Sequence, residues 1–351
     1  MLQSKNKGLF VEFSEFSVLA ARTNGFKLPM EIQAIAEHPL DRKAEHESVK
    51  AFLDDFAGTK DGTYTIARCG VYPEGRFIRL YEAESANKVK DRGHLTEVLK
   101  NEFNVDPETH VVSLLDARDG SDLVLEKAVA KKVVFCGAPT SGLQSAQDGL
   151  LEKGLYPERM EISTATTLGG VCDYARFHSI NAPVLVLELT SKSTNIFIQN
   201  GGQVQVTRPV PFGLDSIYPL LQRELGLKDE ASARKLFFSN TFDFAEMGPK
   251  LLRRIVKELQ ASTGFYEVQT GQTIDRMFMS VLPANLGWIG QAFADALGVE
   301  IMQPSVESWL ESLNVKAADG VELARLGSRW MGLFSMMGAF HLRQEVADGQ
   351  K

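Results

Sequence analysis

The sequence contains an internal repeat, which limits the possible folds more than any other feature. Segments beginning at Leu9 and Leu185 align without a gap over 17 positions at a constant offset of 176 residues. The matching or similar pairs are Glu12 and Glu188, Ser14 and Thr190, Ser17 and Ser193, Asn24 and Asn200, and Gly25 and Gly201. Two unrelated hairpins can resemble each other, but these copies stand half of a 351-residue chain apart. That spacing favours two related lobes.

Each copy of the repeat has the pattern of three strands joined by two turns. The apolar runs lie at 9–13, 18–22 and 28–36 in the first copy, and at 184–189, 194–198 and 203–210 in the second. The first turn of each copy is short and polar. The second contains Asn-Gly, a strong hairpin signal because both turn residues need a positive φ. Each lobe is therefore predicted to open with a meander in which an acidic residue, Glu12 or Glu188, faces the first turn.

The rest of the chain alternates between helical and strand patterns. Apolar residues at i, i+3 and i+4 predict helices over 46–57, 94–103, 140–154, 165–178, 216–226, 247–269 and 286–298. Three of them end on a glycine, which favours a helix stop: Gly154, Gly226 and Gly298. Strands are predicted over 109–116, 127–137 and 276–282. The segment 321–343 is predicted to be a buried helix rather than a membrane-bound one, since its apolar residues cover more than one face. The class is α/β with mixed sheets.

Composition excludes several functions. A net charge of -7 argues against nucleic-acid binding, which needs clustered Lys and Arg. Cys69, Cys136 and Cys172 are too far apart in the sequence to suggest a zinc site or a disulfide framework, and they suit a reducing compartment. No signal peptide is expected at the start, and no apolar stretch approaches the roughly 20 residues that a bilayer requires.

Common catalytic motifs are missing from the sequence. There is no Walker P-loop, and the six histidines form no H-E-x-x-H motif. Residues 137–142, GAPTSG, resemble a phosphate-binding turn, but a strand-to-helix junction capped by Thr140 or Ser141 explains them better. The repeat places Glu12 and Glu188 toward one cleft, where two carboxylates can hold Mg²⁺ or orient a water. The alternative, slightly favoured, is that each is a solvated or capped residue at a strand end.

The segment 194–217 resembles the opening of the second lobe in the PilM family, the actin-like proteins of type IV pilus assembly. The match rests on Thr194, Asn195, Gly202, Thr207, Arg208, Pro211, Phe212 and Gly213. Residues 254–305 resemble that family's helix ending in Phe265 and Tyr266, then a strand, a loop and a helix ending at Leu297 and Gly298. Overall the resemblance is weak over 8–22 and good over 131–345, and over 37–130 it extends only to the layout.

This resemblance implies an actin-like, two-lobed α/β fold with duplicated RNase H-like lobes and a small inserted α/β subdomain in the first lobe. The first lobe is predicted to comprise 1–72 and 151–181, with 73–150 as the insertion. The second lobe is predicted to comprise 182–214 and 273–351, with 215–272 as its own subdomain.

In active members of the family, both opening hairpins carry an Asp and a glycine that hold ATP phosphates, and a later Gly-Gly-Gly loop approaches the adenosine. Here these positions differ. The positions that correspond to this degenerate nucleotide site are Glu12, Ser14, Leu19, Glu188, Thr190, Asn195, Val281, Pro283 and Ala284. Each side chain that replaces a glycine removes easy access to positive φ and fills space near the phosphates. No cofactor is expected on this basis, and ATP with Mg²⁺, held through Glu12 and Glu188, is the alternative.

The resemblance implies a non-catalytic scaffold, cytoplasmic and peripheral at an inner membrane. Its expected partner is the cytoplasmic tail of a PilN-like membrane protein, bound between the first-lobe core and the insertion, with a pilus assembly ATPase as a further candidate. Membrane contact is expected only through the partner, and no nucleic acid is expected. Three alternatives stay open: an active ATPase or sugar-kinase-like enzyme, a component of type II secretion similar to GspL, and a filament-forming protein similar to FtsA.

Overall fold

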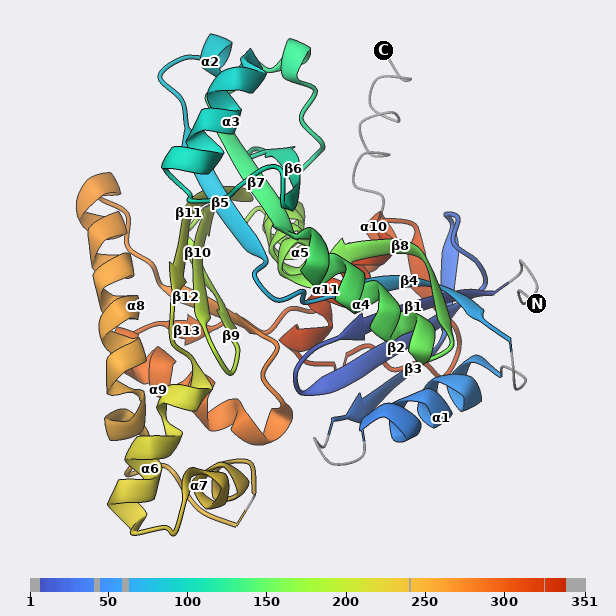
Figure 1. Cartoon of the computed structure of the whole chain (residues 1–351), viewed down its shortest axis with the longest axis vertical. Coiled ribbons are helices and arrows are strands. Elements are labelled where there is room, and N and C mark those ends of the chain that lie inside the picture. Colours follow the sequence, from blue (N-terminus) through green and yellow to red (C-terminus); the bar gives the residue numbers. More distant parts are fainter. Residues whose placement is uncertain (1–6, 41–44, 59–62, 240, 325, 339–351) are drawn as a thin grey trace. The chain divides into compact units, whose positions relative to one another are not determined.

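A computed structural model describes residues 7–40, 45–58, 63–239, 241–324 and 326–338 (Figure 1). The chain forms two compact units. The first unit comprises residues 1–178, 305–326 and 330–351, and the second comprises 179–304 and 327–329. Among the described residues, no helix is long and apolar enough to cross a membrane.

The first unit is built on a six-stranded sheet with the order β14-β3-β2-β1-β4-β8. Its strands are β1 (Gly8–Phe13), β2 (Ser17–Thr23), β3 (Met30–Pro39), β4 (Thr65–Val71), β8 (Leu155–Ile162) and β14 (Val315–Ala317). The first three form the predicted antiparallel meander, whereas β4 pairs in parallel with β1 and β8 pairs in parallel with β4.

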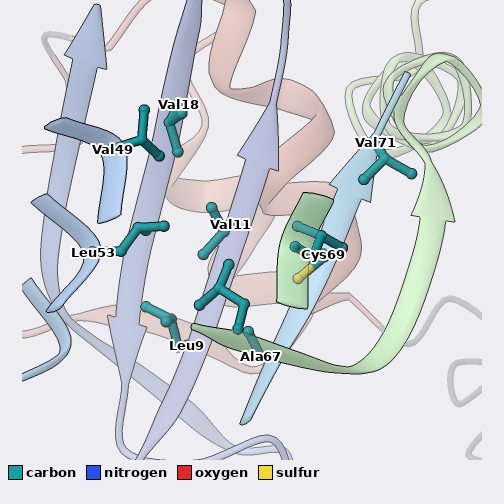
Figure 2. Close-up of a cluster of buried hydrophobic side chains, with 10 residues drawn as sticks. Leu9, Val11, Val18, Val49, Leu53, Ala67, Cys69 and Val71 are labelled. Carbon is teal, nitrogen blue, oxygen red and sulfur yellow. The ribbon is translucent and has the colours of Figure 1, made fainter. Parts of the chain in front are cut away.

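Helices cover both faces of this sheet, because successive side chains of a strand point to opposite faces. Leu9 and Val11 of β1 pack against α1 (Glu45–Ala57), from which Val49 and Leu53 are directed at the sheet in Figure 2. Leu150 of α4 (Thr140–Glu152) joins the same cluster. The opposite face, toward which Glu12 points, meets α5 (Ser163–Phe177) and α11 (Met331–Met337).

A separate three-stranded antiparallel sheet is inserted between β4 and β8. It has the order β5-β7-β6, from β5 (Phe77–Glu82), β6 (His110–Asp116) and β7 (Lys132–Pro139). Two helices, α2 (Ala86–Lys90) and α3 (Arg92–Asn101), bury Val89, Leu95 and Val98 against Phe77 and Phe135. The predicted insertion, 73–150, was too long at its end, because α4 packs through Leu150 on the six-stranded sheet instead.

The second unit repeats the topology of the first. Its sheet has the order β11-β10-β9-β12-β13, from β9 (Val184–Leu189), β10 (Thr194–Asn200), β11 (Gln203–Val210), β12 (Arg276–Ser280) and β13 (Glu300–Ile301). Its helices are α6 (Tyr218–Leu225), α7 (Glu230–Phe237), α8 (Gly248–Thr270) and α9 (Gly287–Leu297). Glu12 pairs with Leu19 as Glu188 pairs with Asn195, so even the register is conserved at the offset of 176. Two duplicated lobes with an insertion in the first are therefore confirmed.

The second turn of each meander differs from the sequence prediction, whereas the helix ends agree with it better. The tight turn of the second meander is Gly201-Gly202, both with positive φ, because Asn200 still pairs with Gln203. In the first meander, residues 24–29 form a longer connection, and Gly25 has no positive φ. Two of the three predicted glycine stops, Gly226 and Gly298, are confirmed as helix caps in the left-handed conformation. The third, Gly154, also has a positive φ but follows Lys153, which is the cap of α4.

The C-terminal part of the chain was assigned to the wrong lobe. The prediction placed all of 273–351 in the second lobe, but 305–326 and 330–351 belong to the first unit. The physical reason is that β14 extends the first sheet beside β3, and α10 (Glu307–Ser312) anchors this segment by burying Trp309. The predicted last helix, 321–343, is also shorter, since α11 begins at Met331, and residues 339–343 lie outside the described residues.

Candidate functional site

The first hairpin turn is closed by the hydroxyl of Ser14, which stands where the resemblance expects glycine. Its Oγ accepts hydrogen bonds from the backbone N–H of Ser17 (3.0 Å) and Phe16 (3.2 Å), and it lies 3.0 Å from the Ser17 carbonyl oxygen, to which it donates. The backbone N–H of Ser14 also donates to that carbonyl, at 3.0 Å. The N–H groups of Ser14, Phe16 and Ser17 are thus used within the turn.

The second hairpin turn has the same construction. Thr190 Oγ1 accepts from the backbone N–H of Ser193 at 3.0 Å and donates to the Ser193 carbonyl oxygen at 3.0 Å. The backbone N–H of Thr190 donates to the same carbonyl at 2.9 Å. The repeat seen in the sequence therefore extends to individual hydrogen bonds, with a hydroxyl residue closing each turn.

The second turn is also covered by the segment that follows β11. The backbone N–H of Leu214 donates to the Thr190 carbonyl at 3.0 Å, and that of Asp215 donates to the Ser191 carbonyl at 2.9 Å. A Cβ atom on Gly213 would lie 2.1 Å from the Thr190 carbonyl oxygen, so no larger residue fits. The Pro-Phe-Gly motif of the sequence is thus a cap on this turn.

Glu12 is buried, at 3% exposed, within the first unit. Tyr72, which directly follows β4, donates its hydroxyl to Glu12 Oε1 at 3.2 Å. Gly332 of α11 lies against the carboxylate, since a Cβ there would be 2.3 Å from Oε2. Leu19, another of the predicted nucleotide-site positions, is buried beside Glu12 in the β1–β2 register and offers no charge.

Glu188 has a different neighbour at the equivalent position. It is 2% exposed, and Asn195 Nδ2 donates to its Oε1 at 2.8 Å across the β9–β10 pair. The two carboxylates belong to different units, and each has a hydrogen-bond donor within its own unit. The described residues contain no group of three or more His, Cys, Asp or Glu side chains suited to a metal ion.

Val281 keeps a glycine-like backbone at the third nucleotide-site position. Its φ is +75°, an unfavourable value for a β-branched residue, and its side chain is buried. The next residues turn into a short 3₁₀ helix (Ala284–Leu286), where the backbone N–H of Leu286 donates to the Pro283 carbonyl at 2.9 Å. The loop thus follows a path suited to glycine, but an isopropyl group fills the space that glycine would leave open.

A pocket of about 270 Å³ opens beside the first turn. Its apolar walls are Phe13, Val71 and Leu150, and Tyr72 and Ala146 also line it. Glu15 and Lys153 contribute charged groups to the lining. Sequence reasoning missed this pocket because α4 was assigned to the insertion. The only signal was that Phe13 follows Glu12 and must therefore point to the opposite face of β1.

The three cysteines are unreactive in this fold. Burial raises the pKa of the Cys69, Cys136 and Cys172 thiols to about 12, so they stay protonated at neutral pH.

The predicted strand-to-helix junction at 137–142 has a structural role. Its helix begins after Pro139 without a side-chain cap, so neither Thr140 nor Ser141 acts as one, and the N–H of Thr140 donates to the Thr109 carbonyl.

Comparison with known proteins gives structural matches only. No protein-family model and no curated protein sequence matches the chain. A chain of the solved PilM-PilN type IV pilus biogenesis complex superposes with a TM-score of 0.65 at 14% sequence identity, covering 95% of this chain and 98% of that chain. This similarity establishes the fold, so the PilM-like, actin-like two-lobed architecture expected from the sequence is confirmed.

Two other solved structures are more distant. The ethanolamine utilization protein EutJ from Carboxydothermus hydrogenoformans has a TM-score of 0.47 at 9% identity, covering 95% of this chain and 90% of that chain. The cytoplasmic domain of EpsL, an inner membrane component of the type II secretion system of Vibrio cholerae, has a TM-score of 0.39 at 9% identity, covering 94% of each chain.

Proposed function

We propose that this protein is a non-catalytic scaffold of an inner-membrane assembly platform that binds the cytoplasmic tail of a PilN-like membrane protein. In this role the protein is cytoplasmic and reaches the membrane through its partner. The pilus role follows the likeness to a chain of the PilM-PilN complex.

The chemistry of the two hairpin turns carries the non-catalytic part of the proposal. A phosphate-binding turn offers backbone N–H groups to the anion. Here the N–H groups of Phe16, Ser17 and Ser193 donate to the hydroxyls of Ser14 and Thr190 inside their own turns. Phosphate binding would require these bonds to break in both lobes.

The carboxylates support the same conclusion. Mg²⁺ takes oxygen ligands at about 2.0–2.1 Å in near-octahedral geometry, usually with several waters. Glu12 and Glu188 are almost fully buried and hydrogen-bonded to Tyr72 and Asn195. The residues at the nucleotide positions therefore do not fit ATP with Mg²⁺, and we derive no reaction from them.

The pocket beside the first turn is a place for the partner's tail. Its volume of about 270 Å³ suits one or two apolar side chains rather than a whole cofactor. Glu15 and Lys153 offer charges of both signs to a peptide backbone or to polar side chains. We propose that an apolar residue of the tail inserts between Phe13 and Leu150.

Isothermal titration calorimetry with Mg-ATP tests the non-catalytic part. We expect no heat and no thermal shift at millimolar nucleotide. Micromolar binding that is abolished in Glu188→Ala would overturn this part and favour the ATPase alternative. The double variant Ser14→Gly, Thr190→Gly tests whether the hydroxyls are the cause, because it frees the N–H groups of both turns. We expect this variant to bind nucleotide weakly where the wild type does not.

Fluorescence anisotropy tests the partner part. The probe is a labelled synthetic peptide with the sequence that precedes the transmembrane helix of the membrane protein encoded immediately downstream. Ala146→Trp fills the pocket and should weaken binding by about tenfold or more, as loss of a buried anchor does. Gln147→Trp, on the same helix but outside the pocket lining, is the matched control and should bind as the wild type does. Equal effects of the two variants would remove the pocket from the proposal.

A further inference from the structure

Helix α8 of the second unit presents a solvent-exposed stripe of side chains along one face. The stripe consists of Lys250, Arg254, Lys257, Ala261, Phe265 and Val268, and all six are exposed. Their spacing of three or four residues places them on one face of an α-helix. Over 18 residues at 1.5 Å each, the stripe is about 27 Å long.

The opposite face of α8 is fully used by the fold. Leu251, Ile255, Leu259 and Tyr266 are buried, and α8 packs on α9 and β10. The residues of the exposed stripe are therefore not needed for packing of the core of the second unit. Phe265 is 64% exposed and Val268 is 88% exposed, although both are large apolar residues one helical turn apart. Exposed aromatic and aliphatic neighbours of this kind commonly mark interaction surfaces.

Charge and apolar surface are separated along the stripe. Its first half carries only positive charges, and its second half carries none. The two acidic residues of α8 are already engaged, because Glu258 pairs with Arg208 and Glu267 accepts from the backbone N–H of Ile274. Lys250 is already paired with Glu224 of α6, and Arg254 stacks 3.9 Å above the Phe212 ring. Lys257 forms no ion pair with any residue that the structure describes.

The middle of the stripe is shaped for close approach. Ala261 has only a methyl group, and a Cβ on neighbouring Gly264 would meet nothing within 4 Å. Helix axes pack 8–10 Å apart, with the closest approach where side chains are small. A partner helix can therefore cross or run along α8 at this point and reach Phe265 and Val268.

We propose that this stripe binds an amphipathic helix of a partner protein, with carboxylates opposite Arg254 and Lys257 and apolar side chains opposite Ala261, Phe265 and Val268. The charge pattern decides the occupant. A flat anionic membrane would have to meet the charged and apolar halves at the same depth, and only two large apolar side chains are available to insert. A helix carries both chemistries in sequence along its length, as the stripe does.

Two labelled synthetic helices of identical composition test the proposal by fluorescence anisotropy with the full-length protein. In the first, glutamates occupy one half of a helical face and leucines and alanines occupy the other half. In the second, the same residues alternate along that face. We expect micromolar binding of the first helix, weakened by salt, and binding of the second at least about fivefold weaker, because its charges cannot align.

Variants of the stripe give the second part of the test. Phe265→Asp and Val268→Asp should each weaken binding by about tenfold, as loss of a central apolar contact does. Lys257→Glu should weaken it and reduce its salt dependence. The matched controls are Val129→Asp and Lys100→Glu, which are exposed on the first unit and should change nothing. Circular dichroism checks that each variant is folded.

Three outcomes would overturn the proposal. The first is equal binding of both helices, or binding of neither at 100 μM peptide, a concentration roughly ten to a hundred times the expected Kd. The second is binding to vesicles of phosphatidylglycerol and phosphatidylcholine that depends on Phe265 while the helices do not bind, which assigns the stripe to lipid. The third is concentration-dependent self-association in analytical ultracentrifugation that Val268→Asp abolishes, which assigns it to a second copy of the chain.

Discussion

Ser14 and Thr190 determine what the two hairpin turns can bind. In each turn one hydroxyl both accepts and donates a backbone hydrogen bond, which replaces the open N–H groups that a glycine would leave. Gly213 has the opposite role, because its missing side chain lets the following segment bond to the Thr190 and Ser191 carbonyls. At this scale, single small side chains determine whether a turn is closed.

Gly213→Ala should strongly destabilise the second unit. The added Cβ would lie 2.1 Å from the Thr190 carbonyl oxygen and 2.8 Å from the Ser193 nitrogen, and both belong to the backbone. Overpacking against backbone that cannot move costs about 3 kcal/mol or more in unfolding free energy. Urea denaturation measures the difference.

Gly264→Ala is the matched control for Gly213→Ala. The new Cβ meets nothing within 4 Å, and Gly264 lies in the interior of α8. The substitution reduces the entropy of the unfolded chain and should raise the unfolding free energy by about 0.4–1 kcal/mol. Similar losses from both substitutions would show that the crowding at Gly213 is not the cause.

Glu161 of β8 should make stability fall as pH rises. Burial raises the pKa of its carboxyl, the charge of Asp122 acts in the same direction, and Arg159 and Arg68 oppose it. Because the folded-state pKa lies above the unfolded value, the stabilising contribution is full below the unfolded pKa, about 4.3, and is lost as pH rises through the folded pKa. Glu161→Gln should therefore raise the melting temperature more at pH 7 than at pH 4.

Asp116 of β6 provides the opposite slope in the same unit. Burial raises the pKa of its carboxyl, but hydrogen bonds from the side chain and backbone of Arg118 outweigh this, and the pKa is lowered overall. Its contribution is present above the unfolded pKa, about 3.9, and is lost as pH falls through the folded pKa. Asp116→Asn should thus lower the melting temperature at pH 7 and have little effect at pH 2. Parallel pH profiles for the Asp116 and Glu161 variants would contradict both assignments.

At the scale of elements, local sequence patterns predicted most of the helices and strands. The two meanders, β12 and the helices α1, α5, α8 and α9 lie where apolar periodicity placed them, to within a few residues. The closure of the two turns by hydroxyl groups was not predicted, although Ser14 and Thr190 stood among the nucleotide-site positions. The bonds that Tyr72 and Asn195 form with the two glutamates were not predicted either, because they depend on register and on chain crossings.

Long-range packing was the part that the sequence did not reveal. Helix α4 has the same local pattern whether it covers the inserted sheet or the six-stranded sheet, and only the position of Leu150 in the folded core distinguishes the two. The position of β14 could not be predicted either, because this three-residue strand pairs with β3, which lies near the other end of the sequence. Such short pairings carry too little pattern to be recognised from one sequence.

A buried hydrogen bond helps to hold the segment that carries α10 and β14 against α5, and its contribution can be measured. Trp309 is fully buried, and its indole Nε1 donates to Asp173 Oδ2 of α5 at 2.8 Å. Trp309→Phe keeps an aromatic ring but leaves the Asp173 carboxylate without this donor. Hydrogen bonds to charged groups contribute about 1.5–3 kcal/mol, so we expect a loss of that size in unfolding free energy.

Hydrogen exchange locates the effect of Trp309→Phe. Exchange should increase in β14, β3 and α5, which belong to the first unit, and stay unchanged in β9 and β10. Ser312→Ala, on the same helix and only part-buried, is the control and should have a smaller effect. Unchanged exchange in β14 would show that the indole bond does not hold this segment.

On the scale of the whole molecule, the two lobes are built from the chain in different ways. The second unit is almost entirely one continuous stretch, 179–304, whereas the first unit needs both the start and the end of the chain. The charge is also unevenly distributed. The second unit contains 12 acidic and 12 basic residues, so the net charge of -7 resides in the first. The lobes therefore share a topology but not a surface.

A chain that ends at Pro304 should lose the first unit and keep the second. It lacks Trp309, Leu333 and Phe334, all fully buried in the first unit. A loss of three large core side chains, at about 3–5 kcal/mol each, is comparable to the total stability of a typical domain. Hydrogen-exchange mass spectrometry should then show protection in β9, β10 and β12 but not in β1 or β4.

The complementary variant joins residues 178 and 305 with a short Gly-Ser linker and omits the second unit. The backbone N–H of Ser305 donates to the Tyr174 hydroxyl at 3.2 Å, so the two ends lie close together. This chain should fold with the protection pattern of the first unit. If it does not, the division of the molecule into these units is wrong.

Because the chain returns into the first unit at its end, the two lobes can finish folding in a different order from that of their synthesis. Domains usually fold as units as they leave the ribosome, at about 5–20 residues per second. Between His178 and Ser305 lie 126 residues, so the first lobe waits roughly 6–25 s for its last strand and helices. During that interval the lobe encoded later can finish folding first. The β3 edge and the face of β1 that will meet α11 are exposed meanwhile, and nascent chains of this protein should be most dependent on chaperones then.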